Sequence, residues 1–344
     1  MATYSQEIAM LDEIELEIVN AVQINPRASW TLIGSVLGID PVTAARRWKR
    51  LTDSGLAWTT VYPSSDALKS VLVAYIEVEC VAGSADTVAR QLIDDPKVAS
   101  IDHITGSADV IVTVFTSDLG DLSRILLETL GTIDGVKATR AHVGTSVHVE
   151  GSQWKLRSLS ADQQDRLRSK LPRVPGVVPR SIDRRDEPLL SELQKDARTS
   201  YSSLAEVMGS SVSTVRRRLD SLIGAQKLIF RCEIAQPLSG WPVSATLWCR
   251  VPPARVDLVA SQVAALPEAR LCSVVTGGPA NLLLSVWLRS VSDTHYLQTA
   301  LTERFTELEV LSSGLTLRQV KRIGRVLDKK QHAVGIVPLR IWTD

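Results

Sequence analysis

The chain is poor in the residue spacings that would make it a metal, redox or disulfide protein. Its four cysteines include no CxxC pair, and their positions do not match between the two halves of the chain; they are Cys80, Cys232, Cys249 and Cys272. Zinc sites and disulfide frameworks need such spacings. We therefore expect reduced cysteines, most of them buried, with no metal site and no cofactor.

Long apolar runs and an excess of charge are also missing. The longest apolar run, Leu282–Leu288, is interrupted by Ser285 and falls far short of the roughly 20 residues that span a bilayer. The N-terminus is polar, so we expect a cytoplasmic protein with no membrane partner. The net charge of +1 gives by itself no reason to expect nucleic acid, although a balanced total can hide a local basic face.

Histidine is scarce and scattered. The five histidines are His103, His142, His148, His295 and His332. None recurs between the two halves, and no Ser/His/Asp or metal-ligand spacing is present. We therefore expect no catalytic residues and no enzymatic activity.

What the chain does contain is a long internal repeat. Shifted by 171 residues, it matches itself at ten of the forty positions from 12 to 51, where chance would give about two or three. The matching pairs are Asp12/Asp183, Gln23/Gln194, Arg27/Arg198, Ser29/Ser200, Val36/Val207, Gly38/Gly209, Thr43/Thr214, Arg46/Arg217, Arg47/Arg218 and Leu51/Leu222. Further on, the same shift pairs Thr105-Gly106 with Thr276-Gly277. We infer two copies of one module.

The first part of each copy is predicted to be three short helices. In copy one, apolar residues recur at helical spacing from Leu11 to Val22. A second helix, 30–37, ends at Gly38, and a third begins at Asp40-Pro41, where Asp is a favoured N-cap and Pro a favoured first residue. Two helices joined by a short turn with glycine form a helix-turn-helix. Copy two repeats the plan.

The second part of each copy alternates strands and helices in the order β-α-β-β-α-β, the ferredoxin-like arrangement. In copy one these segments are 71–81, 86–93, 98–105, 110–115, 118–130 and 136–149, and in copy two they are 244–251, 257–265, 270–276, 282–288, 293–305 and 310–321. The turn 277–281 is one residue longer than its counterpart 106–109.

The predicted fold is therefore α+β, with a winged or plain helix-turn-helix domain followed by a βαββαβ effector domain, twice. We expect domains at 1–60, 61–150, 181–235 and 236–328, a linker at 151–180 and a tail at 329–344. Ser160 can cap a helix in the linker, and Pro172, Pro175 and Pro179 then prevent regular structure. The apolar tail residues should dock onto the body; they are Ile336, Val337, Leu339, Ile341 and Trp342.

The third helix of each copy carries a cluster of basic side chains on the element that a helix-turn-helix presents to DNA. Such clusters bind phosphates, and side chains near the helix start contact base edges. The predicted DNA-binding residues are Asp40, Thr43, Arg46, Arg47, Lys49 and Arg50 in copy one, and Ser213, Thr214, Arg216, Arg217 and Arg218 in copy two. The polar groups at the helix start could equally serve only as caps, and Trp48 and Leu219 are expected in the core.

Two of these arginines have an alternative structural role. Arg47 precedes Leu51 by four residues, so it could lie beside the apolar seam and pair with Asp12 or another acid of the first helix. Arg218 and Asp183 would repeat that pair. Ion pairing and phosphate contact are both open at this stage.

The turn between the two central strands is the second candidate site. Glycine lets a backbone approach a ligand closely, and an aspartate could hold an ammonium group, although the segment could also be only a hairpin turn. The candidate effector-binding residues are Thr105, Gly106, Ser107 and Asp109, with Thr276, Gly277 and Asn281 in copy two.

Together these motifs resemble the leucine-responsive regulatory protein/AsnC family. The resemblance rests on Leu11-Asp12, 25–29, 38–40, Thr43, Arg46-Arg47 and 105–109, and on Ile182-Asp183, 196–200, Gly209, 213–215 and Arg218. It implies a regulator of transcription that binds double-stranded DNA and a small effector, often an amino acid, and that assembles into homo-oligomers at the nucleoid. It also points to Thr105, Gly106 and Asp109 as effector contacts, while Asn281 departs from the pattern.

Two other functions are compatible with this build. Siroheme decarboxylases share it and are sometimes fused in tandem, but they need histidines and arginines around an anionic tetrapyrrole. A ligand sensor whose helix-turn-helix no longer binds DNA is the other. The differing recognition-helix starts, 41–46 and 212–217, further suggest two unequal half-sites on DNA.

Overall fold

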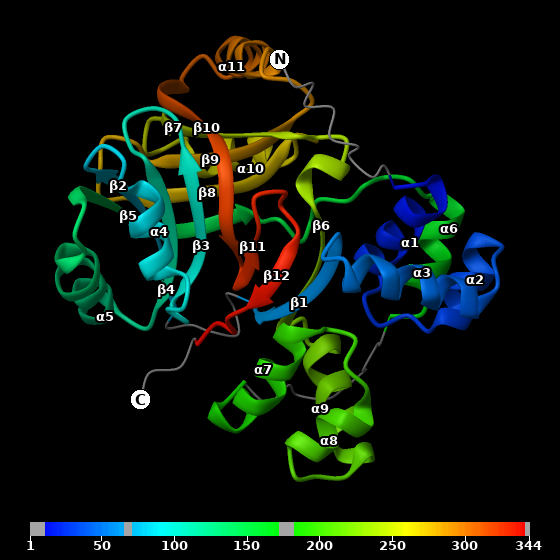
Figure 1. The fold of residues 1–344 in the computed structure, drawn as a ribbon. Helices are drawn as coiled ribbons and strands as arrows, with labels where there is room; N and C mark the ends of the chain where they lie inside the picture. Colours follow the sequence, from blue (N-terminus) through cyan, green and yellow to red (C-terminus); the bar gives the residue numbers. More distant parts are fainter. Residues whose placement is uncertain (1–10, 65–70, 172–181, 341–344) are drawn as a thin grey trace, which may run out of the picture.

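The computed structural model describes residues 11–64, 71–171 and 182–340 of the chain (Figure 1). Its first three helices are α1 (Glu13–Ile24), α2 (Trp30–Leu37) and α3 (Pro41–Asp53). The side chains of Asp12, Ser29 and Asp40 each accept a hydrogen bond from a backbone N–H of the first turn. Gly38 ends α2 in the left-handed conformation, with φ of 70°. These caps confirm the predicted helix-turn-helix.

Copy two folds in the same way. Its helices are η4 (Arg184–Asp186), α7 (Glu187–Lys195), α8 (Tyr201–Val207) and α9 (Val212–Gly224). Asp183, Ser200 and Ser211 are the N-caps at the positions where the repeat expects them. Gln226 follows α9 with φ of 54°, in the left-handed region that its repeat partner Gly55 also adopts with φ of 68°.

Both βαββαβ units are present in the predicted order. The first consists of β2 (Leu72–Cys80), α4 (Ala85–Leu92), β3 (Val98–Ile104), β4 (Val110–Thr116), α5 (Leu119–Arg124) and β5 (Val136–Val149). The second consists of β7 (Val243–Arg250), α10 (Val256–Ala264), β8 (Ala269–Thr276), β9 (Leu282–Leu288), α11 (Asp293–Arg304) and β10 (Glu309–Arg322). The helix predicted at 118–130 changes type along its length, because α5 continues as the π-helical turn η2 (Ile125–Thr129) and the 3-10 turn η3 (Leu130–Thr132).

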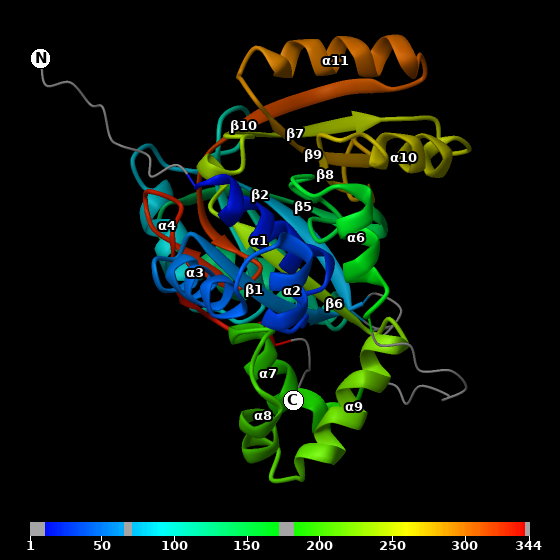
Figure 2. The ribbon, with the colours of Figure 1, turned by 90° about the vertical axis from the view of Figure 1, so that its right-hand side faces the viewer.

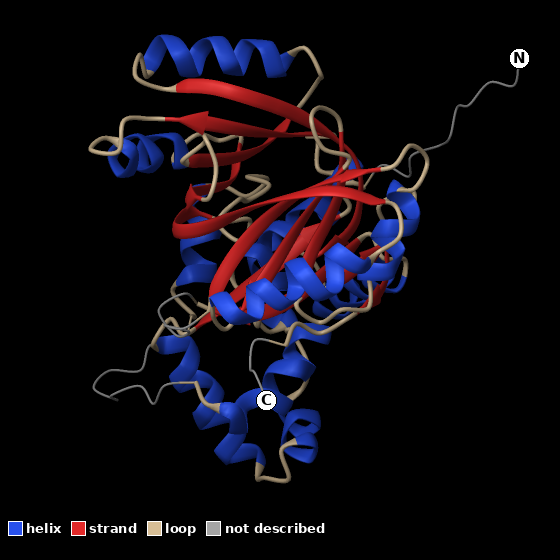
Figure 3. Cartoon of the chain, turned by 90° about the vertical axis from the view of Figure 1, so that its left-hand side faces the viewer, coloured by secondary structure: helices blue, strands red, loops and turns tan. Residues whose placement is uncertain are grey.

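The two sheets are joined into one closed arrangement. Strand β5 pairs with β2 of its own copy through its first half and with β8 of the other copy through its second half. Strand β10 does the same with β7 and β3. The order β10-β3-β4-β2-β5-β8-β9-β7 therefore returns to β10. Figure 3 shows the strands between outer layers of helices.

The core follows from this layering. One cluster packs α4 and α5 on the outer face of the first sheet, and another packs α10 and α11 on the second. Between the sheets lies a third cluster that includes Tyr75, Ile111, Trp248 and Leu283. The cysteines are free, and three of the four are buried, as expected.

Two strands that the sequence analysis did not predict connect the helix-turn-helix domains to the sheets. These are β1 (Ala57–Pro63) and β6 (Leu228–Ile234), which pair antiparallel with Thr60 opposite Arg231. Residues 60 and 231 are 171 apart, so each is the repeat partner of the other. A pseudo-two-fold axis therefore passes through this ribbon and relates the two copies.

The linker and the tail both return to a helix-turn-helix domain. The capped linker helix is α6 (Ala161–Arg168), which packs beside α1 and α2 (Figure 2). The tail forms β11 (Arg325–Leu327) and β12 (Ala333–Ile336), and Leu339 is buried after them. The Gln23 side chain accepts a hydrogen bond from Leu156 N–H, and its partner Gln194 accepts one from Leu339 N–H. The three linker prolines, Ile341 and Trp342 lie outside the described residues.

We predict that Gly55→Ala destabilises the fold more than Gly209→Ala. Both glycines have positive φ, where a side chain costs about 1–2 kcal/mol. A methyl at Gly55 would also press on the backbone of Ala333 in β12, whereas the space at Gly209 is open. Urea unfolding of the two variants measures the difference, and equal losses would contradict a tight seat for the tail.

Candidate functional site

The recognition helices bury one face and expose the other. Helix α3 buries Ala44, Trp48 and Leu51, as expected for Trp48. Helix α9 buries Val215, Leu219 and Leu222, as expected for Leu219. The exposed faces carry the remaining basic side chains, and the apolar side chains of Val42 and Val212 stand exposed at the helix starts. Both helices thus present a basic face with an apolar tip.

Arg46 and Arg217 are the freest of the basic side chains. They are repeat partners, both are exposed, and neither has a hydrogen-bond or ion-pair partner among the described residues. Arg216 lies over the Tyr201 ring at 4.8 Å, and Lys49 pairs with Asp53 on its own helix at 2.6 Å. Arg46 and Arg217 therefore have guanidinium groups available for an outside anion.

The other three arginines are tied to acids of the first helix of their own copy. Arg47 forms an ion pair with Asp12, and Arg50 with the buried carboxylate of Glu15. Although burial opposes the shift, the bond to Arg47 lowers the pKa of Asp12. Arg218 donates from Nε to Asp186 at 2.9 Å. Asp186 is the repeat counterpart of Glu15, so Arg218 forms an ion pair with an acid three residues after the expected Asp183.

The short polar residues at the helix starts act as caps. Asp40 Oδ1 accepts hydrogen bonds from the backbone N–H groups of Val42 at 2.9 Å and Thr43 at 3.1 Å. In copy two the Ser211 hydroxyl accepts one from Thr214 N–H at 3.2 Å and lies 2.9 Å from the Ser213 hydroxyl. All of these groups are at the surface, so capping leaves their outer side open.

A reciprocal pair of arginines, here called the arginine clasp, joins the two helix-turn-helix domains. Arg27 donates to the backbone oxygens of Ala197 at 2.6 Å and Thr199 at 3.0 Å. Its repeat partner Arg198 donates to those of Pro26 at 2.6 Å and Ala28 at 2.7 Å.

Each clasp arginine also covers an aromatic ring of the opposite copy. Arg27 lies 4.7 Å from the centre of the Tyr201 ring, and Arg198 lies 4.1 Å from that of Trp30. Burial lowers the pKa of Arg198 to about 10, so it remains charged at neutral pH. Because four charge-assisted hydrogen bonds cross one junction, the clasp holds the recognition helices at one separation.

The predicted effector turns lie at the seam between the two sheets. Thr105 exchanges hydrogen bonds with the backbone of Leu315 in β10, and Gly106 lies against Ser313 and Gly314. Asp109 Oδ2 accepts from Cys80 N–H at 2.7 Å. Ser107 is exposed.

The second turn makes equivalent contacts despite its extra residue. Thr276 pairs with Val143 of β5, and Gly277 lies against Ala141. Asn281 Oδ1 accepts from Val251 N–H at 2.9 Å. Asn281 therefore replaces Asp109 in the same backbone contact, and neither turn lines the internal cavity described next.

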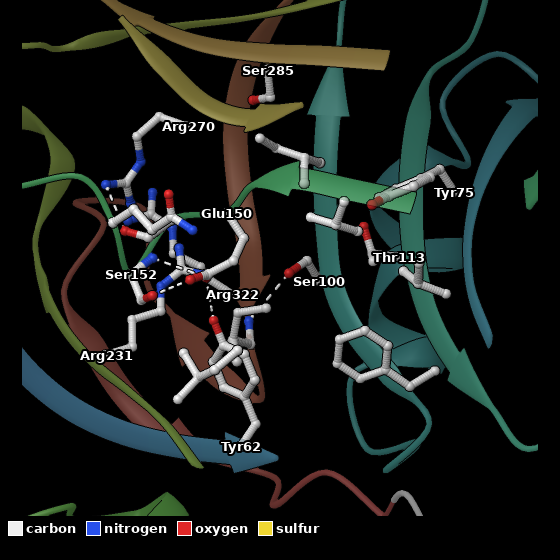
Figure 4. A pocket seen from close by; sticks show the side chains of 18 of the residues that line it. Tyr62, Tyr75, Ser100, Thr113, Glu150, Ser152, Arg231, Arg270, Ser285 and Arg322 are labelled. Carbon is white, nitrogen blue, oxygen red and sulfur yellow. Dashed lines mark hydrogen bonds and ion pairs between the residues drawn. The ribbon is translucent and has the colours of Figure 1, made fainter. Parts of the chain in front are cut away.

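An internal cavity of about 450 Å³ lies where the two sheets meet the β1–β6 ribbon. Figure 4 shows Arg270, Arg231 and Glu150 on one side of it and Tyr75 and Thr113 on the other. Aromatic and aliphatic side chains and serine and threonine hydroxyls make up much of the remaining wall; they include Tyr62, Val73, Ser100, Phe115, Ser244, Leu271, Ser285 and Trp287. Cavities of this size and composition commonly hold small molecules.

Three buried arginines surround one carboxylate at the wall of this cavity. Glu233 accepts from Arg231 Nε, from Arg270 Nη2 at 3.0 Å and from Arg322 Nη1 at 3.1 Å. Burial alone would raise the pKa of Glu233, but the three guanidinium groups lower it to about 2. Burial lowers the pKa of Arg270 to about 10. Trp287 stacks on Arg270 at 3.8 Å.

Glu150 is the second acid of this wall. It accepts hydrogen bonds from the Tyr62 hydroxyl and from Ser152 N–H, the latter at 2.9 Å. Asp102 also lines the cavity, so three acidic side chains stand against the three arginines. These side chains formally balance, and the wall therefore suits a ligand with no net charge.

All three arginines belong to the second copy. Their repeat partners are Thr60, Ala99 and Gly151, which carry no charge. A side chain at Gly151 would overlap the guanidinium of Arg231. The cationic wall is therefore a departure from the repeat, and the absent side chain of copy one makes room for it.

Sequence reasoning missed these arginines because it searched the matching positions of the repeat. The available signal was their replacement of small or neutral repeat partners. Arg270 begins a predicted strand and Arg322 follows one, whereas Arg231 lies in β6, which was not predicted. The described residues contain no group of three or more His, Cys, Asp or Glu placed to hold a metal ion. No helix within the described ranges has the length and apolarity to cross a membrane.

Two protein-family models match the chain. The AsnC-type helix-turn-helix domain matches residues 11–52 and again residues 182–223, and the Lrp/AsnC ligand binding domain matches residues 73–154. The chain therefore carries domains of the Lrp/AsnC family, with the helix-turn-helix domain present twice.

Relatives of single-copy length match about two fifths of the chain. The HTH-type transcriptional regulator FL11 of Pyrococcus furiosus is 28% identical over 145 residues, which are 42% of this chain and 95% of the relative. The Bkd operon transcriptional regulator of Pseudomonas aeruginosa is 27% identical over 138 residues, 39% of this chain and 90% of the relative.

Two solved structures match nearly the whole chain, and both are of the siroheme decarboxylase NirDL. The match to its complex with an iron-uroporphyrin III analogue has a TM-score of 0.58 and covers 90% of this chain and 93% of that chain at 13% identity. The likeness shows that the two proteins share the tandem fold.

We predict that Asp102→Asn flattens the pH dependence of stability. Burial raises the pKa of Asp102 to about 6 from 3.8, against the opposing effects of Gln319 and Arg322. The folded state therefore favours the protonated carboxyl group of Asp102. Its contribution to the free energy of unfolding is fully present below pH 3.8, the pKa in the unfolded chain, and is lost as the pH rises through about 6, the pKa in the folded chain.

The free energy of unfolding of the Asn variant, measured relative to that of the parent, should therefore be higher at pH 8 than at pH 4 by on the order of 2 kcal/mol. Urea unfolding at both pH values measures this change, with the exposed Asp165→Asn as the matched control. A parallel shift of both profiles would show that Asp102 does not titrate in this range.

Proposed function

We propose that the protein is a sequence-specific DNA-binding regulator of transcription in which one chain acts as a pseudo-dimer. The observation that carries this proposal is the pair of clasped helix-turn-helix domains, each with a free arginine on its recognition helix. Two domains held at one separation bind two half-sites as a unit, because the first contact raises the effective concentration of the second. The regulators among its relatives support the same conclusion.

The two recognition helices should read different bases. Helix α3 presents Val42, Thr43 and Arg46, and α9 presents Ser213, Thr214 and Arg217 at its start. A valine methyl suits a thymine methyl, whereas a serine hydroxyl donates or accepts a hydrogen bond at a base edge. We therefore propose an operator with two unequal half-sites.

A response to a small effector, in the first instance an amino acid or related metabolite, is part of this proposal. So are further pairing of whole chains into a homo-oligomer and a cytoplasmic location at the nucleoid. The closed sheet supports a pseudo-dimer as the building block, because β10 already pairs with β3, and β5 with β8, within the chain.

A siroheme-decarboxylase-like activity is the second candidate, favoured by the NirDL fold and the three arginines. The cavity wall opposes it, since three acidic side chains balance the three arginines and the described lining contains no histidine. A tetrapyrrole with several carboxylates would need more positive charge. A changed siroheme absorption spectrum on adding the protein would favour the enzyme.

We predict that Arg46→Ala and Arg217→Ala each weaken binding to the DNA upstream of the protein's own gene by about tenfold and reduce its salt dependence. Each variant loses one phosphate-binding cation. Footprinting should show that each substitution weakens protection of a different half-site. Arg90→Ala on α4, an exposed arginine far from both helices, is the control for electrophoretic mobility shift. Unchanged binding in both variants would mean that these helices do not contact DNA.

We also predict that the arginine clasp fixes the spacing of the half-sites. Inserting five base pairs, about half a helical turn, between the half-sites should weaken binding by the parent chain strongly. The double variant Arg27→Ala, Arg198→Ala should tolerate the insertion better, because its domains are free to adjust. The control is Arg304→Ala on α11. An equal penalty for parent and double variant would assign the spacing to the β1–β6 ribbon alone.

A further inference from the structure

The internal cavity contains a buried donor without a partner. Arg322 is 4% exposed, and its Nη1 is bonded to Glu233, but its Nη2 has no hydrogen-bond partner among the described residues. A buried guanidinium N–H left unpaired costs free energy, so native structures rarely keep one without a use. Here the free N–H belongs to a residue that lines the cavity.

Two acceptors without partners lie on the same wall. Asp102 Oδ1 and Gln319 Oε1 are both shielded from solvent and lack a hydrogen-bond partner among the described residues. Both residues line the cavity, and they face each other across the β3–β10 pairing, where Asp102 lies opposite Gln319. Arg322 follows Gln319 by three residues on β10. One donor and two acceptors are therefore gathered at one place.

This set is the complement of an amino acid head group. A carboxylate accepts from the Arg322 Nη2 group, and an ammonium donates to the Asp102 carboxylate and the Gln319 carbonyl. Because Asp102, Glu150 and Glu233 formally balance the three arginines, the wall matches a zwitterion, which has no net charge. A phosphate dianion would bring two uncompensated negative charges beside Asp102.

The rest of the cavity suits an apolar side chain. Val73, Tyr75, Phe115, Leu271 and Trp287 line it, and at about 450 Å³ it is larger than a head group needs. The cavity also reaches Tyr62 on β1 and Ile229 on β6. These strands directly follow the recognition helices α3 and α9, so an occupant touches the segments that carry both DNA-binding domains.

We propose that this cavity is a single effector site per chain for an amino acid with an apolar side chain, held by Arg322, Asp102 and Gln319. The site is single because its arginines have no counterparts in copy one. Its regulatory role rests on the proposed function, whereas ligand binding itself does not.

The test starts with thermal shift of the full-length chain against the standard L-amino acids at millimolar concentration. Isothermal titration then follows with the best apolar one and with its N-acetyl and carboxamide derivatives. We expect one molecule bound per chain, and at least tenfold weaker binding when either the ammonium or the carboxylate is blocked. Failure of every apolar amino acid to bind, or two molecules per chain, would overturn the proposal. Equal binding of either derivative would overturn it as well.

Variants locate the site independently of the arginine cluster. Ser285→Leu fills the cavity from β9 and should abolish binding, while the matched Ser290→Leu, exposed just after the same strand, should not. Arg322→Gln should weaken binding at least tenfold. If Arg322→Gln does not fold, Ser285→Leu still decides. If Asp109→Ala abolishes amino acid binding and Ser285→Leu retains it, the ligand lies at the turns instead.

Mobility shift separates this proposal from the proposed function. If the parent chain binds DNA but no amino acid, the cavity site alone is refuted. If it binds an amino acid but no DNA, the regulator alone is refuted.

Discussion

An unpaired strand edge is the constraint on which this structure depends. The sheet of each βαββαβ unit has one edge formed by β3 in copy one and by β8 in copy two. Its last strand, β5 or β10, extends beyond the sheet. The second half of β5 pairs with β8, and that of β10 with β3. Since both pairings occur within one chain, the two copies fold as one body. The β1–β6 ribbon and the arginine clasp repeat this reciprocity, so the pseudo-two-fold axis runs from the sheets to the DNA-binding domains.

Most of the local structure could be predicted because it depends on short-range rules. Asp40, Ser200 and Ser211 cap the helices that their positions indicated, and the strands follow the apolar alternation. The β1–β6 ribbon was missed because each strand gains its partner only from the other copy, 171 residues away. Arg47 pairs with Asp12, the first of the expected acids, whereas Arg218 forms an ion pair with Asp186, three residues after the expected Asp183.

The cavity could not be predicted for a different reason. Its wall combines residues from every strand from β1 to β10, which only the closed sheet and the β1–β6 ribbon bring together. An arginine in a strand commonly indicates an exposed position, yet Arg231, Arg270 and Arg322 are all buried. Their burial depends on Glu233 and on Trp287. Glu233 is close to Arg231 in sequence, but both are far from Arg322.

Gly151 shows what gene duplication made available to this fold. In a homodimer every substitution occurs in both copies, so one codon would encode residues 151 and 322, and the glycine that makes room for Arg231 could not coexist with Arg322. Here residues 151 and 322 are repeat partners with different identities, and Gly151 accommodates Arg231. The halves have consequently become non-interchangeable. A chain assembled from two second halves would carry a side chain where Arg231 needs space, so the duplication can no longer be reversed by exchanging one half for the other.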